Sequence, residues 1–230
     1  MLKENLTHVR NNIINACNRV DRDPNEVTLI AVSKTKPLSD IEELITYGER
    51  EFGENKVQEL TEKYDNISEP VNWHLIGHLQ TNKVKYIVDK VALIHSVDSL
   101  HLAKEIEKEA AKKNVIVNIL IQVNIAKEDT KFGINEEDVY DLLYSIKDFK
   151  HIKIQGLMTI APFVENAEDN RVHFRNLYQL LLDIKTKNID NVNMSVLSMG
   201  MTNDYEVAIE EGATMVRVGT GIFGERNYNI

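Results

Sequence analysis

Two kinds of segment alternate along the whole chain, and this alternation limits the folds open to it. Short runs rich in Val, Ile and Leu are typical of buried strands, while longer runs with apolar residues three and four apart predict amphipathic helices. Eight strands are expected, at residues 27–33, 50–53, 72–76, 92–96, 116–123, 152–157, 193–198 and 215–218. A helical pattern follows nearly all of them, which favours a parallel sheet covered by helices.

Eight such repeats in 230 residues predict a single-domain (β/α)8 barrel of the TIM type, with 1–230 as one domain. An open doubly wound sheet is the competing architecture. Only residues 219–230 follow the eighth strand, too few for a substantial closing helix, so an extra N-terminal helix is expected to cover that gap. Further helical patterns lie at 100–113, 136–146 and 167–187, and Ser39 with Glu42 forms a capping-box pattern for a helix that Gly48 ends.

Composition excludes several classes of protein. The chain has 27 Lys plus Arg against 36 Asp plus Glu, a formal charge of −9, which argues against nucleic-acid binding because phosphates need a basic surface. Cys17 is the only cysteine, so neither an internal disulfide nor a cysteine-based zinc site can form. With no signal peptide or membrane-spanning run in the sequence, we expect a soluble cytoplasmic protein with no membrane partner.

Lys34 follows the first expected strand, in the segment AVSKTKP. Loops after the strands converge on the barrel mouth, where loss of solvation lowers the pKa of a lysine towards that of an amine able to form an imine. Most lysines are solvated loop residues, and this remains the alternative. Lys36 falls on the same side by strand periodicity, but Lys34 lies nearer the strand and is therefore held more firmly.

Small and hydroxyl residues follow the last two expected strands, in SMGMTND (198–204) and VRVGTGIFGER (216–226). Loops at these positions form the recurrent phosphate site of such barrels, and Thr202 and Thr220 add hydroxyl donors. The alternative is that the glycines only turn the chain. Residues 219–224 also match GxGxxG, but a dinucleotide fingerprint requires a βαβ unit and a later acidic residue, and both are missing.

Histidines offer a third candidate site. His74 and His78 are four residues apart and His95 ends another strand, but a strand and turn do not place two such rings on one face as a helix would. No carboxylate completes a metal signature, so we predict core or hydrogen-bonding histidines and no metal. Asn55, after the second strand, either reaches the barrel mouth or caps the next helix.

Six motifs together carry a resemblance to the pyridoxal phosphate homeostasis protein family, single-domain relatives of the barrel of alanine racemase. They are AVSKTKP (31–37), FGEN (52–55), WHLIGHLQTNK (73–83), GLMTI (156–160), SMGMTND (198–204) and VRVGTGIFGER (216–226). The motifs span almost the whole chain in order. Two positions depart from the family pattern: Thr202, where many relatives carry serine, and His78, whose position varies.

The resemblance implies a barrel that holds pyridoxal 5′-phosphate as a Schiff base on Lys34. It implies phosphate contacts from Thr202, Gly219 and Thr220, and an arginine, Arg217, that faces the pyridine nitrogen. Asn55, His74 and Ser198 complete the cofactor-binding positions that we expect from the same motifs.

Three functions fit these residues. The first is a protein that carries and buffers pyridoxal 5′-phosphate without turnover, as a monomer that meets PLP-dependent apoenzymes transiently, and takes part in vitamin B6 and amino-acid homeostasis. The second is a small PLP-dependent enzyme such as an amino-acid racemase. The third is a metal-dependent barrel hydrolase that uses the histidines. The resemblance favours the first.

Overall fold

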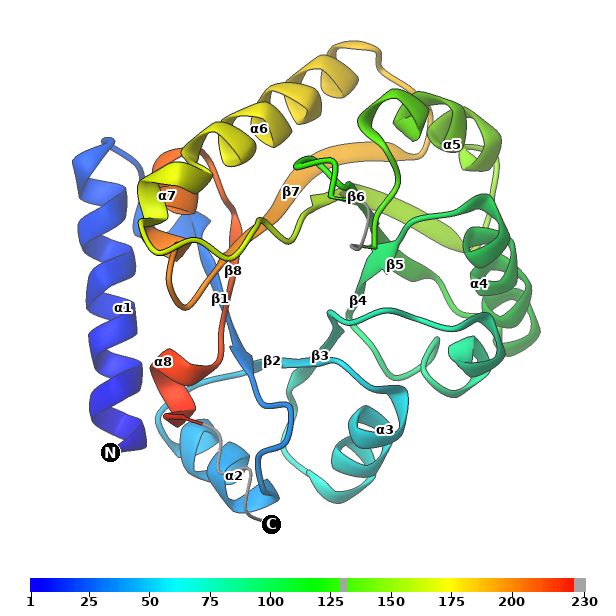
Figure 1. Cartoon of the computed structure of the whole chain (residues 1–230). Helices are drawn as coiled ribbons and strands as arrows, with labels where there is room; N and C mark the ends of the chain where they lie inside the picture. Colours follow the sequence, from blue (N-terminus) through cyan, green and yellow to red (C-terminus); the bar gives the residue numbers. More distant parts are fainter. Residues whose placement is uncertain (129–131, 226–230) are drawn as a thin grey trace.

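The computed structural model describes residues 1–128 and 132–225, and in it eight parallel strands close into a barrel surrounded by helices (Figure 1). The strands are β1 (Thr28–Val32), β2 (Glu51–Glu54), β3 (Asn72–Leu75), β4 (Leu93–Val97), β5 (Val117–Gln122), β6 (Ile152–Met158), β7 (Val192–Met201) and β8 (Met215–Val218). The first strand pairs in parallel with the eighth, from Thr28 opposite Met215 to Ala31 opposite Val218. This closure confirms the predicted barrel and excludes the open doubly wound sheet.

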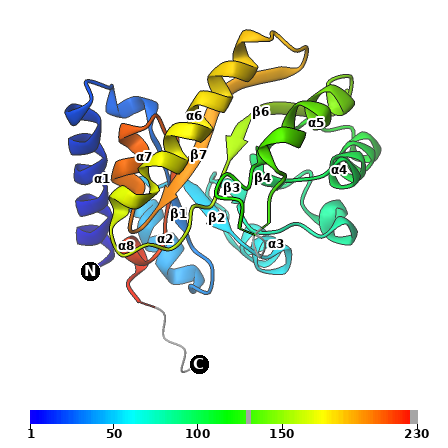
Figure 2. The same cartoon turned by 45° about the horizontal axis from the view of Figure 1, so that its top comes forward.

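The helices lie outside the strands, and the turned view in Figure 2 shows them as an outer layer. They are α1 (Leu2–Arg19), α2 (Leu38–Thr46), α3 (Val57–Asn66), α4 (Leu100–Lys113), α5 (Val139–Ile146), α6 (Arg171–Thr186), α7 (Tyr205–Glu210) and α8 (Thr220–Phe223). Short 3-10 helices occupy Pro24–Glu26, Thr81–Tyr86, Glu136–Asp138 and Ala167–Asn170. Within the described residues, no helix has the length and apolar composition needed to cross a membrane.

The first helix closes the outer layer where β8 leaves it open. Helix α8 has only four residues, and α1 packs alongside it and α7. Asn5 donates to the Ile222 carbonyl (2.9 Å) and Asn12 donates to the Tyr205 hydroxyl (3.0 Å). The predicted extra N-terminal helix therefore covers the expected gap.

Two local predictions need correction. Helix α2 begins at Leu38 with Pro37 as its N-cap, so Ser39 lies inside the first turn and the predicted capping box does not form. Proline supplies the fixed φ that a helix start tolerates, which moves the boundary ahead of the serine. Strand β7 runs to Met201, three residues past its predicted end, because the chain continues to pair with β8 beyond a bulge.

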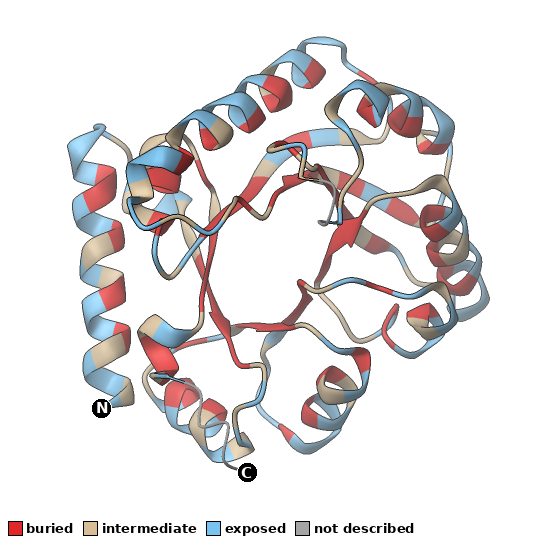
Figure 3. Ribbon diagram, in the orientation of Figure 1, coloured by how far each residue is buried: buried red, intermediate tan, exposed pale blue. Residues whose placement is uncertain are grey.

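Alternation along the strands divides the buried residues into two sets. Side chains such as Ile119 and Ile121 join the large apolar core between strands and helices, while Leu93, Leu120 and Met158 form a smaller cluster inside the barrel. Figure 3 shows buried residues along the strands and on the inner sides of the helices. Polar side chains, among them Ser198 and Arg217, also lie in the interior, and they connect to the candidate site.

Candidate functional site

Arg217 lies in the barrel interior, on β8, and is only 3% exposed. Its guanidinium donates to the Ser198 hydroxyl (2.6 Å) and to the Thr159 carbonyl (2.8 Å). Burial lowers the pKa of Arg217 to about 10, partly offset by the negative charge of Asp204. Because this pKa lies well above 7, the barrel interior holds a fixed positive charge at neutral pH.

Thr202 and the turn into α8 form a cluster of small polar groups at the carboxyl ends of β7 and β8, the strand that carries Arg217. The Thr202 hydroxyl oxygen accepts from the backbone N–H groups of Gly219 (3.3 Å) and Gly221 (3.5 Å). Thr202 and Gly219 follow β7 and β8 directly, where the sequence predicts them, and Gly221 lies in the first turn of α8. The last residue of the second motif, Arg226, lies outside the described residues.

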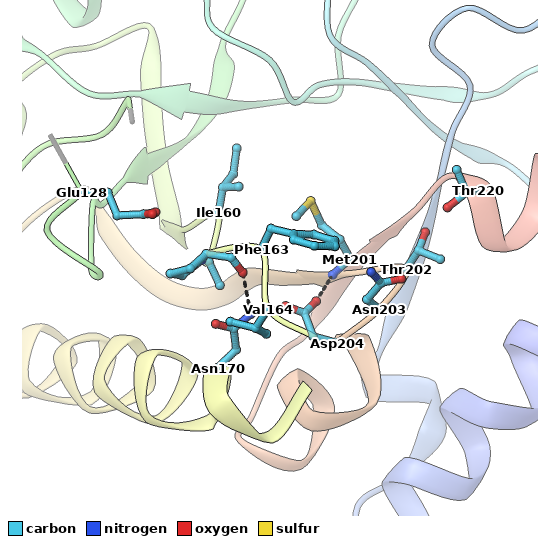
Figure 4. Close-up of a pocket in the computed structure, with 12 residues that line it drawn as sticks. Glu128, Ile160, Phe163, Val164, Asn170, Met201, Thr202, Asn203, Asp204 and Thr220 are labelled. Carbon is cyan, nitrogen blue, oxygen red and sulfur yellow. Dashed lines mark hydrogen bonds between the residues drawn. The ribbon is translucent and has the colours of Figure 1, made fainter. Parts of the chain in front are cut away.

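A cavity of about 630 Å³ opens beside this cluster, and Thr202 and Thr220 both line it. Figure 4 shows these two hydroxyl side chains on neighbouring loops near the start of α8. The other lining residues are Glu128, Ile160, Ala161, Pro162, Phe163, Val164, Asn170, Met201, Asn203 and Asp204. Its volume is in the range of small-molecule and cofactor sites.

Lys34 is half-buried in the turn directly after β1, and the backbone is fixed on both sides of it. Lys63, on α3, donates to the Ser33 carbonyl (2.7 Å), and the Thr35 N–H donates to the Glu59 carboxylate (2.5 Å). Thr35 adopts a left-handed φ of 62°, a conformation that non-glycine residues rarely adopt without such support. The turn that presents Lys34 is therefore held in one conformation.

The support comes from a buried cluster that the sequence analysis did not find. Lys63 is 5% exposed and pairs with Glu54 (2.8 Å) and Glu59 (2.7 Å), and the Ser33 hydroxyl donates to Glu54 (2.6 Å). Burial raises the pKa of Glu54, against the opposing effects of the Lys63 charge and hydrogen bond. The i, i+4 spacing of Glu59 and Lys63 was visible in the sequence, but the burial of this pair was not.

Lys36 contacts the C-terminal end of the chain's last described helix, α8. Its ammonium donates to the carbonyls of Phe223 (3.1 Å) and Glu225 (3.5 Å), at the end of α8. Cations are stabilised at such helix ends, so this contact gives Lys36 a structural role. Strand periodicity could not separate the two lysines, whereas the structure gives Lys36 this contact with the end of α8.

Asn55 and His74 lie at different levels of the barrel. Asn55 follows β2 at the mouth, and its backbone approaches Gly77 so closely that a Cβ there would lie 2.4 Å from the Asn55 carbonyl oxygen. His74 is buried on β3 and lines a cavity of about 280 Å³ among residues at the N-terminal ends of the strands. The structure thus brings Asn55 to the mouth and His74 towards the opposite end.

The histidines do not form a metal site in the part of the chain that is described. His78 stacks on Phe132 with ring centroids 4.0 Å apart, while the His74 ring contacts His95 and Glu51. The described residues contain no group of three or more His, Cys, Asp or Glu side chains placed to hold a metal ion.

Known proteins resemble both this fold and this sequence. The family model for the N-terminal domain of alanine racemase matches residues 5–227, so the chain is a barrel of that class. The pyridoxal phosphate homeostasis proteins of Aquifex aeolicus and Pseudomonas aeruginosa are 46% and 39% identical to it, over 98% and 99% of this chain and 98% and 96% of theirs. The chain belongs to the pyridoxal phosphate homeostasis protein family.

A solved structure supports the same family assignment. PipY of Synechococcus elongatus, determined with PLP bound, superposes with a TM-score of 0.85 at 32% identity. The match covers 97% of this chain and 100% of PipY.

Proposed function

We propose that residues 1–230 form one cofactor-binding domain that carries and buffers pyridoxal 5′-phosphate as a Schiff base on Lys34, and so takes part in vitamin B6 and amino-acid homeostasis. The observation that carries the proposal is the meeting of three features at the carboxyl ends of the strands. They are the fixed Lys34 turn, the cluster of Thr202 with the Gly219 and Gly221 N–H groups, and the buried Arg217. The PLP-bound PipY structure supports it.

The phosphate would lie against Thr202, Gly219 and Thr220. Backbone N–H groups and hydroxyls that converge in one turn are suited to an anion because they offer donors without bulky side chains. In the structure the N–H groups of Gly219 and Gly221 donate to the Thr202 hydroxyl oxygen at 3.3 and 3.5 Å, and a bound phosphate would take over these long contacts. The site therefore fits a phosphorylated ligand.

Lys34 would hold the cofactor covalently. When bound, the cofactor supplies an aldehyde that forms an imine with a lysine amine and an aromatic ring that can accept electrons. The hydrogen bonds to the residues on either side fix the direction in which Lys34 leaves the backbone. Lys36 would stay on the carbonyls at the end of α8.

Arg217 would face the pyridine nitrogen and limit the chemistry. A guanidinium only donates hydrogen bonds, so it can bind the nitrogen lone pair, whereas a proton there would place two positive charges in contact. An unprotonated ring withdraws electrons poorly. This suits a carrier, because the bound cofactor is then less able to react further with an amino acid. Ser198 would contribute by fixing Arg217, and Asn55 by lining the mouth.

The proposed protein is a cytoplasmic monomer that meets PLP-dependent apoenzymes only transiently and has no turnover of its own. A racemase is the alternative, and it needs an acid/base group on each face of the substrate α-carbon. Incubation of the loaded protein with L-alanine in heavy water separates the two functions. Exchange of the α-proton at roughly 1 per second or faster would favour the racemase.

Borohydride labelling tests the attachment. The wild type loaded with PLP should absorb in the violet, and reduction should fix the cofactor on the peptide that contains Lys34. The matched control is Lys36→Ala, which should keep both the band and the label, while Lys34→Ala should lose both. A label found on Lys36 in the wild type would refute the assignment.

A further inference from the structure

A chain of hydrogen bonds runs through the barrel from Arg217 towards its N-terminal face. Ser198 Oγ lies 2.9 Å from His95 Nδ1, His95 Nε2 lies 2.9 Å from His74 Nδ1, and His74 Nε2 lies 2.7 Å from a carboxylate oxygen of Glu51. Ser198 and His95 are fully buried, and the Glu51 side chain is 25% exposed. Five strands, β2, β3, β4, β7 and β8, contribute inward-facing residues to this chain, which we call the interior relay.

The two ends of the interior relay have fixed roles. Arg217 can only donate, and an ionised Glu51 can only accept. Hydrogen bonds from His74 and Asn72 lower the pKa of Glu51, although its burial acts in the opposite direction. Burial, the largest cause, and the charge of Arg217 hold the pKa of His95 well below its usual value, so this ring is neutral.

These roles determine the position of every hydrogen in the relay when both rings are neutral. His74 must carry its hydrogen on Nε2 to donate to Glu51, so its Nδ1 accepts from His95 Nε2. His95 Nδ1 then accepts from the Ser198 hydroxyl, and Ser198 Oγ keeps its lone pairs for Arg217. All donors point from Arg217 towards Glu51, and the aligned dipoles stabilise the buried positive charge.

The opposite direction would disturb Arg217. His95 would then donate from Nδ1 to Ser198 Oγ, which already accepts from Arg217, and the Ser198 hydrogen would have to turn towards another group. With neutral rings the carboxylate of Glu51 excludes this arrangement, because His74 Nε2 would face it without a hydrogen.

We propose that Glu51 and His74 are positioning residues for Arg217, which act through His95 and Ser198 to orient the guanidinium towards the cofactor's pyridine ring. The proposal rests on the proposed function only for its last step. The direction of the relay is a property of the protein itself and can be measured without the cofactor.

Glu51→Gln provides the sharpest test because it retains the shape of the side chain. A glutamine amide both donates and accepts, so it permits either direction and removes the bias. Thr28→Val is the matched control, since Thr28 lines the same N-terminal cavity outside the relay. Nitrogen-15 spectra of histidine-labelled protein report which ring nitrogen carries the hydrogen.

Under conditions where both rings are neutral, the cofactor-free wild type and Thr28→Val should show His95 and His74 with the hydrogen on Nε2. Glu51→Gln should give a mixture of tautomers at His95, which Glu51 does not touch. A wild-type His95 with its hydrogen on Nδ1, or a His95 signal unchanged in Glu51→Gln, would overturn the proposal.

The cofactor readout tests the last step. Glu51→Gln should weaken PLP binding by about threefold to tenfold, the range expected for one hydrogen bond, and Thr28→Val should stay within about twofold. In a Ser198→Ala background, Glu51→Gln should have no further effect, because the link to Arg217 is already broken. Unchanged affinity in the single variant, or a full effect in the Ser198→Ala background, would overturn the positioning role. Loss of the Lys34 label in the wild type would instead refute the proposed function and leave the tautomer result standing.

Discussion

Glu51 and Glu54 lie at the two ends of the same short strand, β2, and their environments are opposite. Glu51 begins the strand at the N-terminal face, is partly exposed, and its pKa is lowered. Glu54 ends the strand beneath the mouth, is fully buried, and its pKa is raised. At Glu51 hydrogen bonds outweigh desolvation, whereas at Glu54 desolvation outweighs the charge of Lys63.

The difference indicates how the barrel divides its tasks. At the mouth, the buried Glu54 and Lys63 bind Ser33, and their charged groups thereby fix the conformation of the turn that carries Lys34. At the N-terminal face, Glu51 remains close to solvent and stays ionised, so its charge fixes the direction of the interior relay. Stability should therefore depend more on the mouth cluster, and cofactor orientation more on the relay.

The largest expected effect follows from breaking the mouth cluster. Lys63→Met should lower the free energy of unfolding by about 3–5 kcal/mol, because it leaves the buried Glu54 without its cation. Lys90→Met is the control, since it removes a surface ion pair with Asp65, whose side chain is 62% exposed, and should cost about 0–1 kcal/mol. Denaturant titration measures both. Equal, small losses would mean that burial at Glu54 does not matter as argued.

A smaller effect is expected on cofactor affinity when a hydroxyl group at the mouth is removed. Thr202→Val should weaken PLP binding by about tenfold, since one hydrogen bond to a charged group contributes about 1.5–3 kcal/mol. Thr202→Ser keeps the hydroxyl and should bind nearly as well as the wild type. Titration of the cofactor-free protein gives the constants, and an affinity for Thr202→Val equal to that of the wild type would count against the phosphate site.

The smallest effect is a pair of opposite pH dependences. The lowered pKa of Glu51 means that its contribution to stability is present above its unfolded pKa and is lost as the pH falls through the folded value. The raised pKa of Glu54 means that its contribution is present below the unfolded pKa and is lost as the pH rises through the folded value.

Unfolding free energies measured from roughly pH 3 to pH 8 should resolve these two trends. Relative to the wild type, Glu51→Gln should become less stable as the pH rises, and Glu54→Gln should become more stable. Differences from the wild type with the same sign of slope in both variants would remove the contrast between the two ends of β2.

The sequence predicted the elements well because each depends on its own pattern. All eight strands occur within three residues of their expected ends, and the helix at Leu100–Lys113 occurs as expected. Ser39 misled because a capping-box pattern is common, and the neighbouring Pro37 started the helix earlier. Competition between such local signals shifts the start of a helix by only one or two residues.

The candidate site was predicted only in part. Thr202 and Gly219 were found together because the loops after the last two strands meet in any such barrel. The contacts of His74 with Glu51 and His95 depend on the register of three neighbouring strands, which no periodicity within one strand reveals. The same holds for Lys63, since its burial depends on how α3 packs beneath the Lys34 turn.

The contact between α1 and α8 has a consequence for synthesis of the protein on the ribosome. Asn5 and its partner Ile222 are 217 residues apart, so at roughly 5–20 residues per second they emerge on the order of ten to forty seconds apart. During that interval the side of α1 that packs on α7 and α8, and the edge of β1 that pairs with β8, lack these native partners. Nascent chains of this protein should therefore depend on chaperones until β8 emerges, and the loop that carries Gly219 should be among the last parts to become competent for binding.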